Sequence, residues 1–289
     1  MLVNRHAGAA TGRGGRDDGD LVDRLVDRLG EELAGMELRA CEPDELGDTA
    51  RAALDEGVDL LAVAGGDGTV NAVAGQLADR DVPLLVVPVG TRNHFATALG
   101  LDSVDAAADA ARAGIDRHVD LGAVGGRVFV NNASIGLYPR LVRRREAHRR
   151  RLSDGLGNVV AAWEQLRHGR RFDVDVDGVP HRAWAVFIGN GCYGASLGDL
   201  LERTALDAGV LDVRVVRAHG RWSRVRLVTA LLTGQLTTTR LVERIVTTGV
   251  RIELDRPQVD VAVDGEVVAL DAPLTVTSRP GALAVRVPR

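Results

Sequence analysis

The chain has 289 residues, a formal net charge of −4, 45% hydrophobic residues and only 3% aromatic residues. This length suits one large domain or two of ordinary size, and the composition excludes a disordered chain. Cys41 and Cys192 lie far apart, which excludes a disulfide framework, and no apolar run reaches the roughly 20 residues that span a bilayer. The N-terminus lacks the apolar core of a signal peptide, so we expect a cytoplasmic protein.

The first third of the chain alternates continuous apolar runs with stretches of helical periodicity. Residues 58–64, apolar except for Asp59, and residues 83–89 are runs of strand length, each followed by glycine. Helical spacing of apolar or alanine residues recurs at 20–33, 70–77, 94–99 and 105–113. Continuous apolar strands that alternate with helices are typical of a parallel sheet covered on both faces.

The pattern changes near residue 120. Gly125-Gly126 separates two alternating runs, which predicts a β-hairpin. Further strands are predicted at 172–176, 182–188, 211–216, 259–263 and 267–270, less clearly at 224–232 and 241–247, and a long polar helix at 140–167. We therefore predict an α/β + β fold: a parallel-sheet α/β domain over residues 1–120 and a mostly antiparallel, β-rich domain over residues 121–289. The last strand could pack back on the first domain.

A glycine-rich turn, Gly65-Gly66-Asp67-Gly68-Thr69, follows the first long apolar strand and opens a helix. Three glycines let the backbone turn tightly and direct N–H groups at phosphate oxygens, and the helix N-terminus adds partial positive charge. Asp67 stands where a carboxylate can hold Mg²⁺ against those phosphates, and Thr69 can cap the helix or touch a phosphate. A plain β–α turn would explain Asp67 or Thr69 but not four of the five positions at once. We therefore favour a phosphate-binding loop.

A second turn, Gly90-Thr91-Arg92-Asn93, ends the next apolar strand and precedes a short helix. The carboxyl ends of parallel strands meet at one edge of a sheet, where ligands bind in such folds. We therefore expect the two turns to face the same crevice. By itself the second turn is explained equally well by a helix cap from Thr91 or Asn93.

Four segments carry a family resemblance that covers essentially the whole chain. They read GGDGTVNAV, PVGTRNHFATALG, NNASIGLYP and VDGE. In this order and spacing they resemble the diacylglycerol kinase catalytic-domain family, which includes bacterial lipid kinases and sphingosine kinases and is related to NAD kinases. The resemblance implies a nucleotide-binding first domain, a lipid-binding second domain, an ATP site with Mg²⁺ between them, and phosphoryl transfer to a diacylglycerol- or sphingoid-like lipid hydroxyl.

The resemblance also implies roles for single residues. Asp264 matches the carboxylate that takes the proton from the lipid hydroxyl, and Asp67 and Glu266 are the other catalytic candidates. Asp67 and Asp207 are the candidate metal ligands. The implied nucleotide-binding residues are Asn4, Gly65, Gly66, Asp67, Gly68, Thr69, Thr91 and Asn93. From the residues alone, Asp264-Gly265 is first of all a hairpin turn, although phosphoryl transfer needs only such a proton acceptor within hydrogen-bond reach.

Three departures from the family pattern keep other functions open. The first loop reads Asn4-Arg5-His6-Ala7-Gly8, where the family commonly has Asn-Pro and a Ser or Thr before Gly. His94 stands where many members carry Asp in a Mg²⁺ network, and Ala208 replaces Asp in a loop that resembles a structural metal site. One alternative is therefore a non-catalytic protein that binds nucleotide or lipid. The other is an NAD kinase-like enzyme, although the Asn-Glu pair expected of it is absent from the chain.

An arginine-rich segment lies between residues 138 and 171, which contains ten arginines and three acidic residues. Arg143, Arg144, Arg150 and Arg151 belong to a run of about three helical turns. This face could dock on the anionic inner face of a membrane, or it is an ordinary solvated face, and we weigh the two equally. Nucleic acid is not an expected partner, because the chain is acidic overall and poor in aromatics. The oligomeric state stays open, with a homodimer as one option.

Overall fold

A computed structural model of the protein describes residues 1–4, 36–90, 93–136, 171–194, 203–218, 220 and 241–289. These residues form two compact units, the first made of Met1–Leu121 with Pro280–Arg289 and the second of Gly122–Arg279. The helices predicted at 20–33 and 140–167 lie outside the described residues, as does the run at 224–232.

The first unit is built on a parallel sheet. Its strands, in the order β2-β1-β3-β4, are β1 (Leu2–Asn4), β2 (Arg39–Cys41), β3 (Leu61–Gly65) and β4 (Leu84–Pro88). The end of β15 (Leu274–Val287) joins β4 in parallel, with Val285 opposite Leu84. All five residues of β3 and the first four of β4 are buried, which explains their uninterrupted apolar sequence. The predicted parallel sheet is confirmed.

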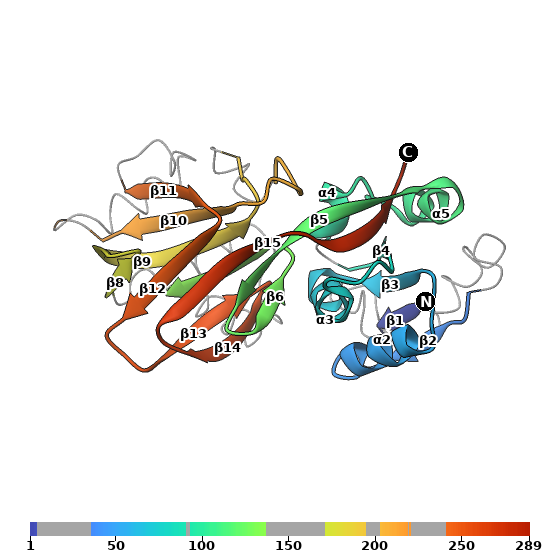
Figure 1. Ribbon diagram of the computed structural model, residues 1–289, viewed down its shortest axis with the longest axis horizontal. Coiled ribbons are helices and arrows are strands. Elements are labelled where there is room, and N and C mark those ends of the chain that lie inside the picture. The colour runs from blue at the N-terminus through green and yellow to red at the C-terminus, as the bar shows by residue number, and fades with distance from the viewer. Residues whose placement is uncertain (5–35, 91–92, 137–170, 195–202, 219, 221–240) are drawn as a thin grey trace, which may run out of the picture. The chain divides into compact units, whose positions relative to one another are not determined.

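Four helices lie among the described residues of the first unit. They are α2 (Leu46–Asp55), α3 (Asp67–Leu77), α4 (His94–Ala98) and α5 (Val104–Ala113). Helices α2 and α3 lie side by side against β1 and β3, whereas α5 contacts β4 (Figure 1). The helices predicted at 70–77, 94–99 and 105–113 are confirmed, and α3 begins inside the glycine-rich turn, three residues earlier than predicted. Among the described residues, none of the helices is long and apolar enough to cross a membrane.

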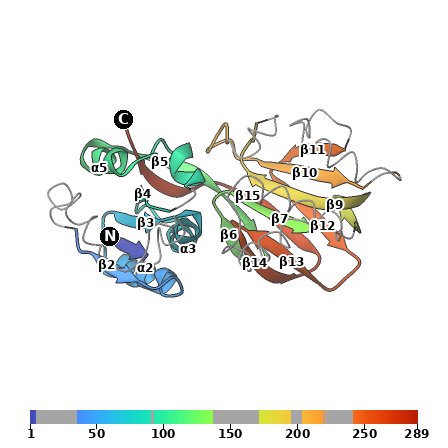
Figure 2. The same ribbon diagram turned by 180° about the vertical axis from the view of Figure 1, so that it is seen from behind.

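The described part of the second unit is built of antiparallel strands. They are β6 (Arg127–Phe129), β7 (Asn132–Gly136), β8 (Phe172–Val176), β9 (Val179–Asn190), β10 (Leu211–Arg217), β11 (Val242–Thr247), β12 (Gly249–Leu254), β13 (Gln258–Val263) and β14 (Glu266–Asp271), with the end of β5 (Ile115–Val124) and the start of β15. Neighbours run β14-β13-β7-β9-β8-β12-β15, and β10 lies between β9 and β11 (Figure 2). The predicted β-rich second half is confirmed, and its core consists mainly of valine, isoleucine and leucine.

Three hairpins of this unit share one kind of two-residue turn. The turns are Gly125-Gly126, Asp177-Gly178 and Asp264-Gly265, and all six residues have positive φ. Positive φ at both positions is the pattern of a type I′ turn, whose twist matches that of the flanking strands. The predicted Gly125-Gly126 hairpin is confirmed, with Val124 opposite Arg127.

Candidate active site

Described residues near the carboxyl ends of β1, β3 and β4 contact one another in the first unit. Asn4, at the end of β1, donates from Nδ2 to Thr69 Oγ1 at 2.7 Å. Asp67, at the start of α3, accepts the backbone N–H groups of His94 and Phe95 at 3.3 and 3.1 Å. The structure thus brings together residues that lie far apart in the sequence and that the sequence marked as candidates.

Gly90 lies directly against the first glycine-rich turn. A Cβ atom added at Gly90 would lie 2.4 Å from Gly66 Cα and 2.8 Å from Gly66 N, distances at which the atoms would overlap. The Asn93 side chain also contacts Gly90, since its Nδ2 donates to the Gly90 carbonyl at 3.0 Å. Only glycine therefore allows the two turns to approach this closely.

Thr69 and Asn93, which were considered as helix caps, do not cap the helices with their side chains. The N-cap of α3 is Gly66, and Thr69 is buried with its hydroxyl bonded to Asn4. Asn93 is the N-cap of α4 but makes no side-chain cap, and Asp67 supplies the acceptors for α4 instead. Thr91 lies outside the described residues.

In the second unit, Asp264 opens the β13–β14 turn, and its carboxylate is held by consecutive backbone N–H groups. Oδ2 accepts from Val130 N at 2.7 Å, and Oδ1 accepts from Asn131 N and Asn132 N at 2.9 and 2.8 Å. In return, Asp264 N donates to the Asn132 carbonyl at 2.9 Å. Successive N–H groups directed at one anion form a backbone nest. Asp264 is therefore both a hairpin residue and an oriented carboxylate.

The environment of Asp264 changes its acidity. Burial raises the pKa of this carboxyl from 3.8 to about 6, although the hydrogen bonds from the nest and the charge of Arg203 act in the opposite direction. A carboxyl group with this pKa is largely ionised at neutral pH and still basic enough to accept a proton.

The other carboxylates predicted for the site lie in more open places. Glu266 is exposed at the start of β14, opposite Val263, and Asp207 is exposed in the loop before β10. Within the described ranges, no group of three or more His, Cys, Asp or Glu side chains could hold a metal. The metal roles of Asp67 and Asp207 therefore stay predictions. Arg143, Arg144, Arg150 and Arg151 lie outside the described residues.

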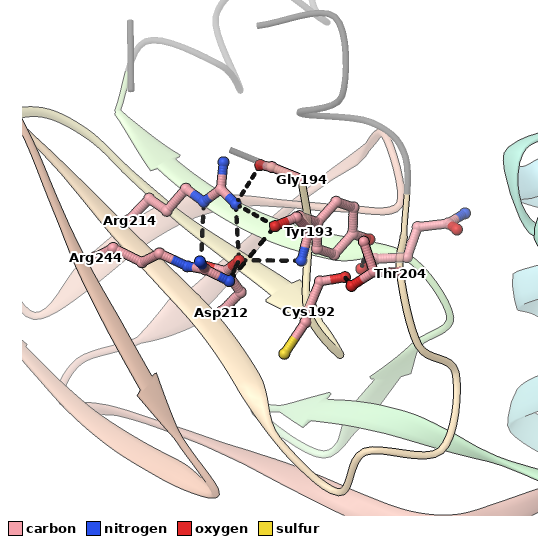
Figure 3. Close-up of polar contacts among 8 residues, drawn as sticks. Cys192, Tyr193, Gly194, Thr204, Asp212, Arg214 and Arg244 are labelled. Carbon is pink, nitrogen blue, oxygen red and sulfur yellow. Dashed lines mark hydrogen bonds and ion pairs between the residues drawn. The ribbon is translucent and has the colours of Figure 1, made fainter. Parts of the chain in front are cut away.

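The sequence pattern did not point to an ion cluster around a buried carboxylate in the second unit. Its members are Asp212 and Arg214 of β10 and Arg244 of β11, called the Asp212 cluster below (Figure 3). Asp212 Oδ2 lies 2.8 Å from Arg214 Nη2 and 2.9 Å from Arg244 Nη2. Burial alone would raise the pKa of Asp212, but the hydrogen bonds from both arginines outweigh burial and lower it. One feature of the sequence could have revealed this cluster: Asp212 and Arg214 stand at alternate positions of an apolar strand, and alternate positions lie on the same face of a sheet.

Two family models match the chain in succession. The diacylglycerol kinase catalytic domain matches residues 1–124, and the YegS C-terminal NAD kinase beta sandwich-like domain matches residues 137–287. A Pseudomonas fluorescens protein named "Probable lipid kinase YegS-like" is 31% identical over 265 residues, which cover 88% of this chain and 87% of that protein. The chain belongs to the diacylglycerol kinase catalytic-domain family.

Other relatives agree with this membership. A "Diacylglycerol kinase" of Bacillus subtilis is 30% identical over 217 residues, which cover 71% of each chain. Two crystal structures of Bacillus anthracis proteins that are described as diacylglycerol kinases superpose on this chain with TM-scores of 0.72 and 0.67, at 23% and 20% identity. Each match covers 99% of this chain and 95% of the other, and at this identity the likeness shows the fold alone. The fold of this family member is therefore that of its relatives over nearly its full length.

Proposed function

We propose that the protein is an ATP-dependent lipid kinase that transfers the γ-phosphoryl group of ATP to the hydroxyl of a diacylglycerol- or sphingoid-like lipid. Family membership supports the reaction class. The observation that carries the proposal is Asp264, a carboxylate oriented by three backbone N–H groups and with a pKa of about 6. These are the properties that a general base at neutral pH requires.

The first unit supplies the nucleotide loops in this proposal. The first N–H groups of α3 have no partner within the helix, and an N-terminal turn of this kind binds phosphate. Each oxygen of Asp67 accepts one N–H group, and a carboxylate has about four acceptor positions, so Asp67 fits a role as magnesium ligand. Mg²⁺ bound to a nucleotide commonly uses one or two carboxylates, and it would neutralise charge on the phosphates.

The second unit supplies the proton acceptor. Asn131 and Asn132 both donate to Asp264 Oδ1, and we assign Oδ2 as the oxygen that accepts the proton of the lipid hydroxyl. As Oδ2 takes the hydroxyl proton, the lipid oxygen forms a bond to the γ-phosphorus, the bond from that phosphorus to the bridging oxygen breaks, and ADP leaves. Because phosphoryl transfer depends mainly on positioning and charge stabilisation, an oriented carboxylate is sufficient as the base.

Transfer of label from ATP tests this function. We expect the purified protein with Mg²⁺ and ATP radiolabelled at the γ-phosphate to label a lipid in vesicles that contain either diacylglycerol or a sphingoid base. Thin-layer chromatography of the lipid extract identifies the acceptor. ATP binding without any labelled lipid, from these vesicles or from a total lipid extract, would instead favour the non-catalytic alternative.

Replacing Gly68 by Ala tests the phosphate loop. A Cβ atom at Gly68 meets nothing within 4 Å in the protein, and alanine favours a helix by about 1 kcal/mol over glycine. We therefore expect unchanged or higher stability, but ATP affinity at least about tenfold weaker, because the methyl group would occupy the space of a phosphate oxygen. Thermal unfolding and calorimetric titration with ATP measure the two quantities.

Gly47→Ala in α2 is the matched control for this substitution. It also replaces a helical glycine, and its Cβ would make ordinary contacts, the nearest at 3.6 Å. ATP affinity should stay at the wild-type value in this variant. Equal ATP affinity in both variants would show that the Gly65–Thr69 turn does not cradle phosphate.

A further inference from the structure

Tyr193 reaches the Asp264 nest through a single peptide unit. Its hydroxyl donates to the Asn131 carbonyl at 2.7 Å, and the N–H group of the same unit, which belongs to Asn132, donates to Asp264 Oδ1 at 2.8 Å. A peptide unit is planar, and a hydrogen bond to its oxygen polarises its N–H group. The Asn131 carbonyl also accepts from Asn190 N at 2.9 Å, so the phenol hydroxyl is a second donor to this unit and further strengthens the bond from Asn132 N to Oδ1.

The preceding peptide unit is held in the same way. The Val130 carbonyl accepts from Asn190 Nδ2 at 3.0 Å and from the Arg203 guanidinium, and the N–H group of this unit, which belongs to Asn131, donates to Asp264 Oδ1 at 2.9 Å. Two peptide units donate their N–H groups to Oδ1, and each of these units is thus also held by hydrogen bonds to its carbonyl oxygen. Oδ2 accepts the nest N–H of Val130 at 2.7 Å.

Tyr193 is itself held at its ring and at its backbone. The ring packs edge-on against Phe187, with 5.6 Å between the ring centroids. The backbone N–H of Tyr193 donates to Asp212 Oδ2 at 3.1 Å, and its carbonyl accepts from Arg214 Nη2 at 3.0 Å (Figure 3). Arg214 also bonds the Gly194 carbonyl at 2.9 Å. Buried, charge-assisted hydrogen bonds of this kind are the strong ones, so the Asp212 cluster fixes the backbone that carries the phenol group.

From these contacts we infer that Tyr193 is a positioning residue for Asp264, and that the Asp212 cluster holds Tyr193 in place for this task. The inference rests on the proposed role of Asp264 as the general base. Tyr193 acts on Oδ1 through the Asn131–Asn132 peptide unit. A carboxylate that is firmly held at Oδ1 cannot rotate about its Cβ–Cγ bond, so Oδ2 keeps one orientation towards the lipid hydroxyl.

The variant Tyr193→Phe tests this inference, because it removes the hydroxyl and keeps the ring and the backbone. We expect kcat to fall about three- to tenfold at neutral pH, which corresponds to one neutral hydrogen bond, with KM for ATP unchanged. Ionised Asp264 loses hydrogen-bond support, so the acid limb of the kcat profile should move up by about half a pH unit. Burial raises the pKa of Tyr193 above its usual value of 10, so the phenol stays neutral over this range.

A measurement without turnover separates this inference from the proposed function. Carbon NMR titration of the aspartate carboxyl groups reports the Asp264 pKa directly, with the Asp264 signal assigned by its absence in Asp264→Asn. The apparent pKa should be higher in Tyr193→Phe than in the wild type. If the wild type transfers no phosphate and this shift is still seen, the proposed function fails and the structural coupling stands.

Thr204→Val is the matched control. The Thr204 hydroxyl donates to the Cys192 carbonyl at 3.1 Å, so the change removes a hydroxyl-to-backbone bond from the same loop without touching the nest. We expect wild-type kcat and a wild-type Asp264 titration from this variant. An Asp264 titration that is unchanged in a folded Tyr193→Phe protein would overturn the inference and reduce Tyr193 to a packing residue.

Discussion

Replacing Asp264 by Asn is expected to lower kcat for lipid phosphorylation by about a thousandfold, within the range that general bases contribute. The amide cannot take the hydroxyl proton. The fold should persist, because Asn tolerates positive φ and its Oδ1 can still accept from Asn131 N and Asn132 N. Steady-state kinetics with the identified lipid, together with calorimetric titration of ATP, should show a loss in kcat at unchanged ATP affinity.

Asp177→Asn is the matched control for this change. Asp177 opens the β8–β9 hairpin with φ of 52°, close to the 45° of Asp264, and its carboxylate also accepts a backbone N–H group, that of Arg251 at 2.7 Å. The variant should keep kcat within about twofold of the wild type, since it lies outside the proposed site. A similar loss in both variants would assign the effect to turn geometry and not to a base.

The pH dependence of the wild type and of Asp264→Asn follows from the same carboxylate. Only ionised Asp264 accepts a proton, so wild-type kcat should rise through a pH of about 6. The free energy of unfolding should change in the opposite sense. The pKa of Asp264 in the folded protein lies above the usual 3.8, so the stabilisation from its protonated form is full below pH 3.8 and is lost as pH rises through about 6. The Asp264→Asn variant has no carboxyl group to titrate at this position, so it does not lose this stability as the pH rises. The free energy of unfolding of the variant minus that of the wild type should therefore rise by up to about 3 kcal/mol from pH 4 to pH 8. A difference that does not vary with pH would contradict the raised pKa.

Breaking the Asp212 cluster should have the largest effect on stability. The variant Asp212→Asn keeps the shape of the side chain but leaves Arg214, which is 4% exposed, without a counter-charge. Removing one partner of a buried ion pair typically costs about 3–5 kcal/mol, since the remaining charge stays buried and uncompensated. Urea unfolding followed by circular dichroism should show this decrease in the free energy of unfolding.

An exposed ion pair of similar length provides the comparison. Arg251 Nε and Glu253 Oε1 lie 2.7 Å apart, but both side chains are more than half exposed. Glu253→Gln should therefore cost less than about 1 kcal/mol. If Asp212→Asn costs no more than Glu253→Gln, the Asp212 cluster does not stabilise the unit, and its hold on Tyr193 is weak.

Elements with a strong local signal could be predicted from the sequence. Residues 60–64 and 83–89 are apolar without interruption because β3 and β4 are buried in a parallel sheet. Gly125-Gly126 between alternating runs became a two-residue hairpin because glycine accepts positive φ at both positions. The same holds for the glycine-rich turn that opens α3, where the candidate phosphate loop was predicted.

Elements without such a signal were missed or only partly predicted. Helix α2 was missed because it buries only Leu46 and Leu54 with two alanines, too few large apolar residues for a clear helical stripe. For β15, a last strand that could pack back on the first domain was expected, but not one that continues through Pro280-Gly281, a dipeptide that locally indicates a turn. It is nevertheless a strand because its start pairs with β12 and its end with β4, and pairing partners are not encoded within the segment itself.

By itself, the sequence determined the fold class, the family and the chemical identity of the candidate residues, because periodicity, glycine turns and motifs are local properties of the chain. Only the tertiary structure decided which groups touch. The Tyr193 hydroxyl meets a carbonyl 62 positions away, and the N–H groups on Asp264 come from residues more than 130 positions earlier. Such contacts depend on strand order and register, which are set by the packing of the whole unit and not by any one segment.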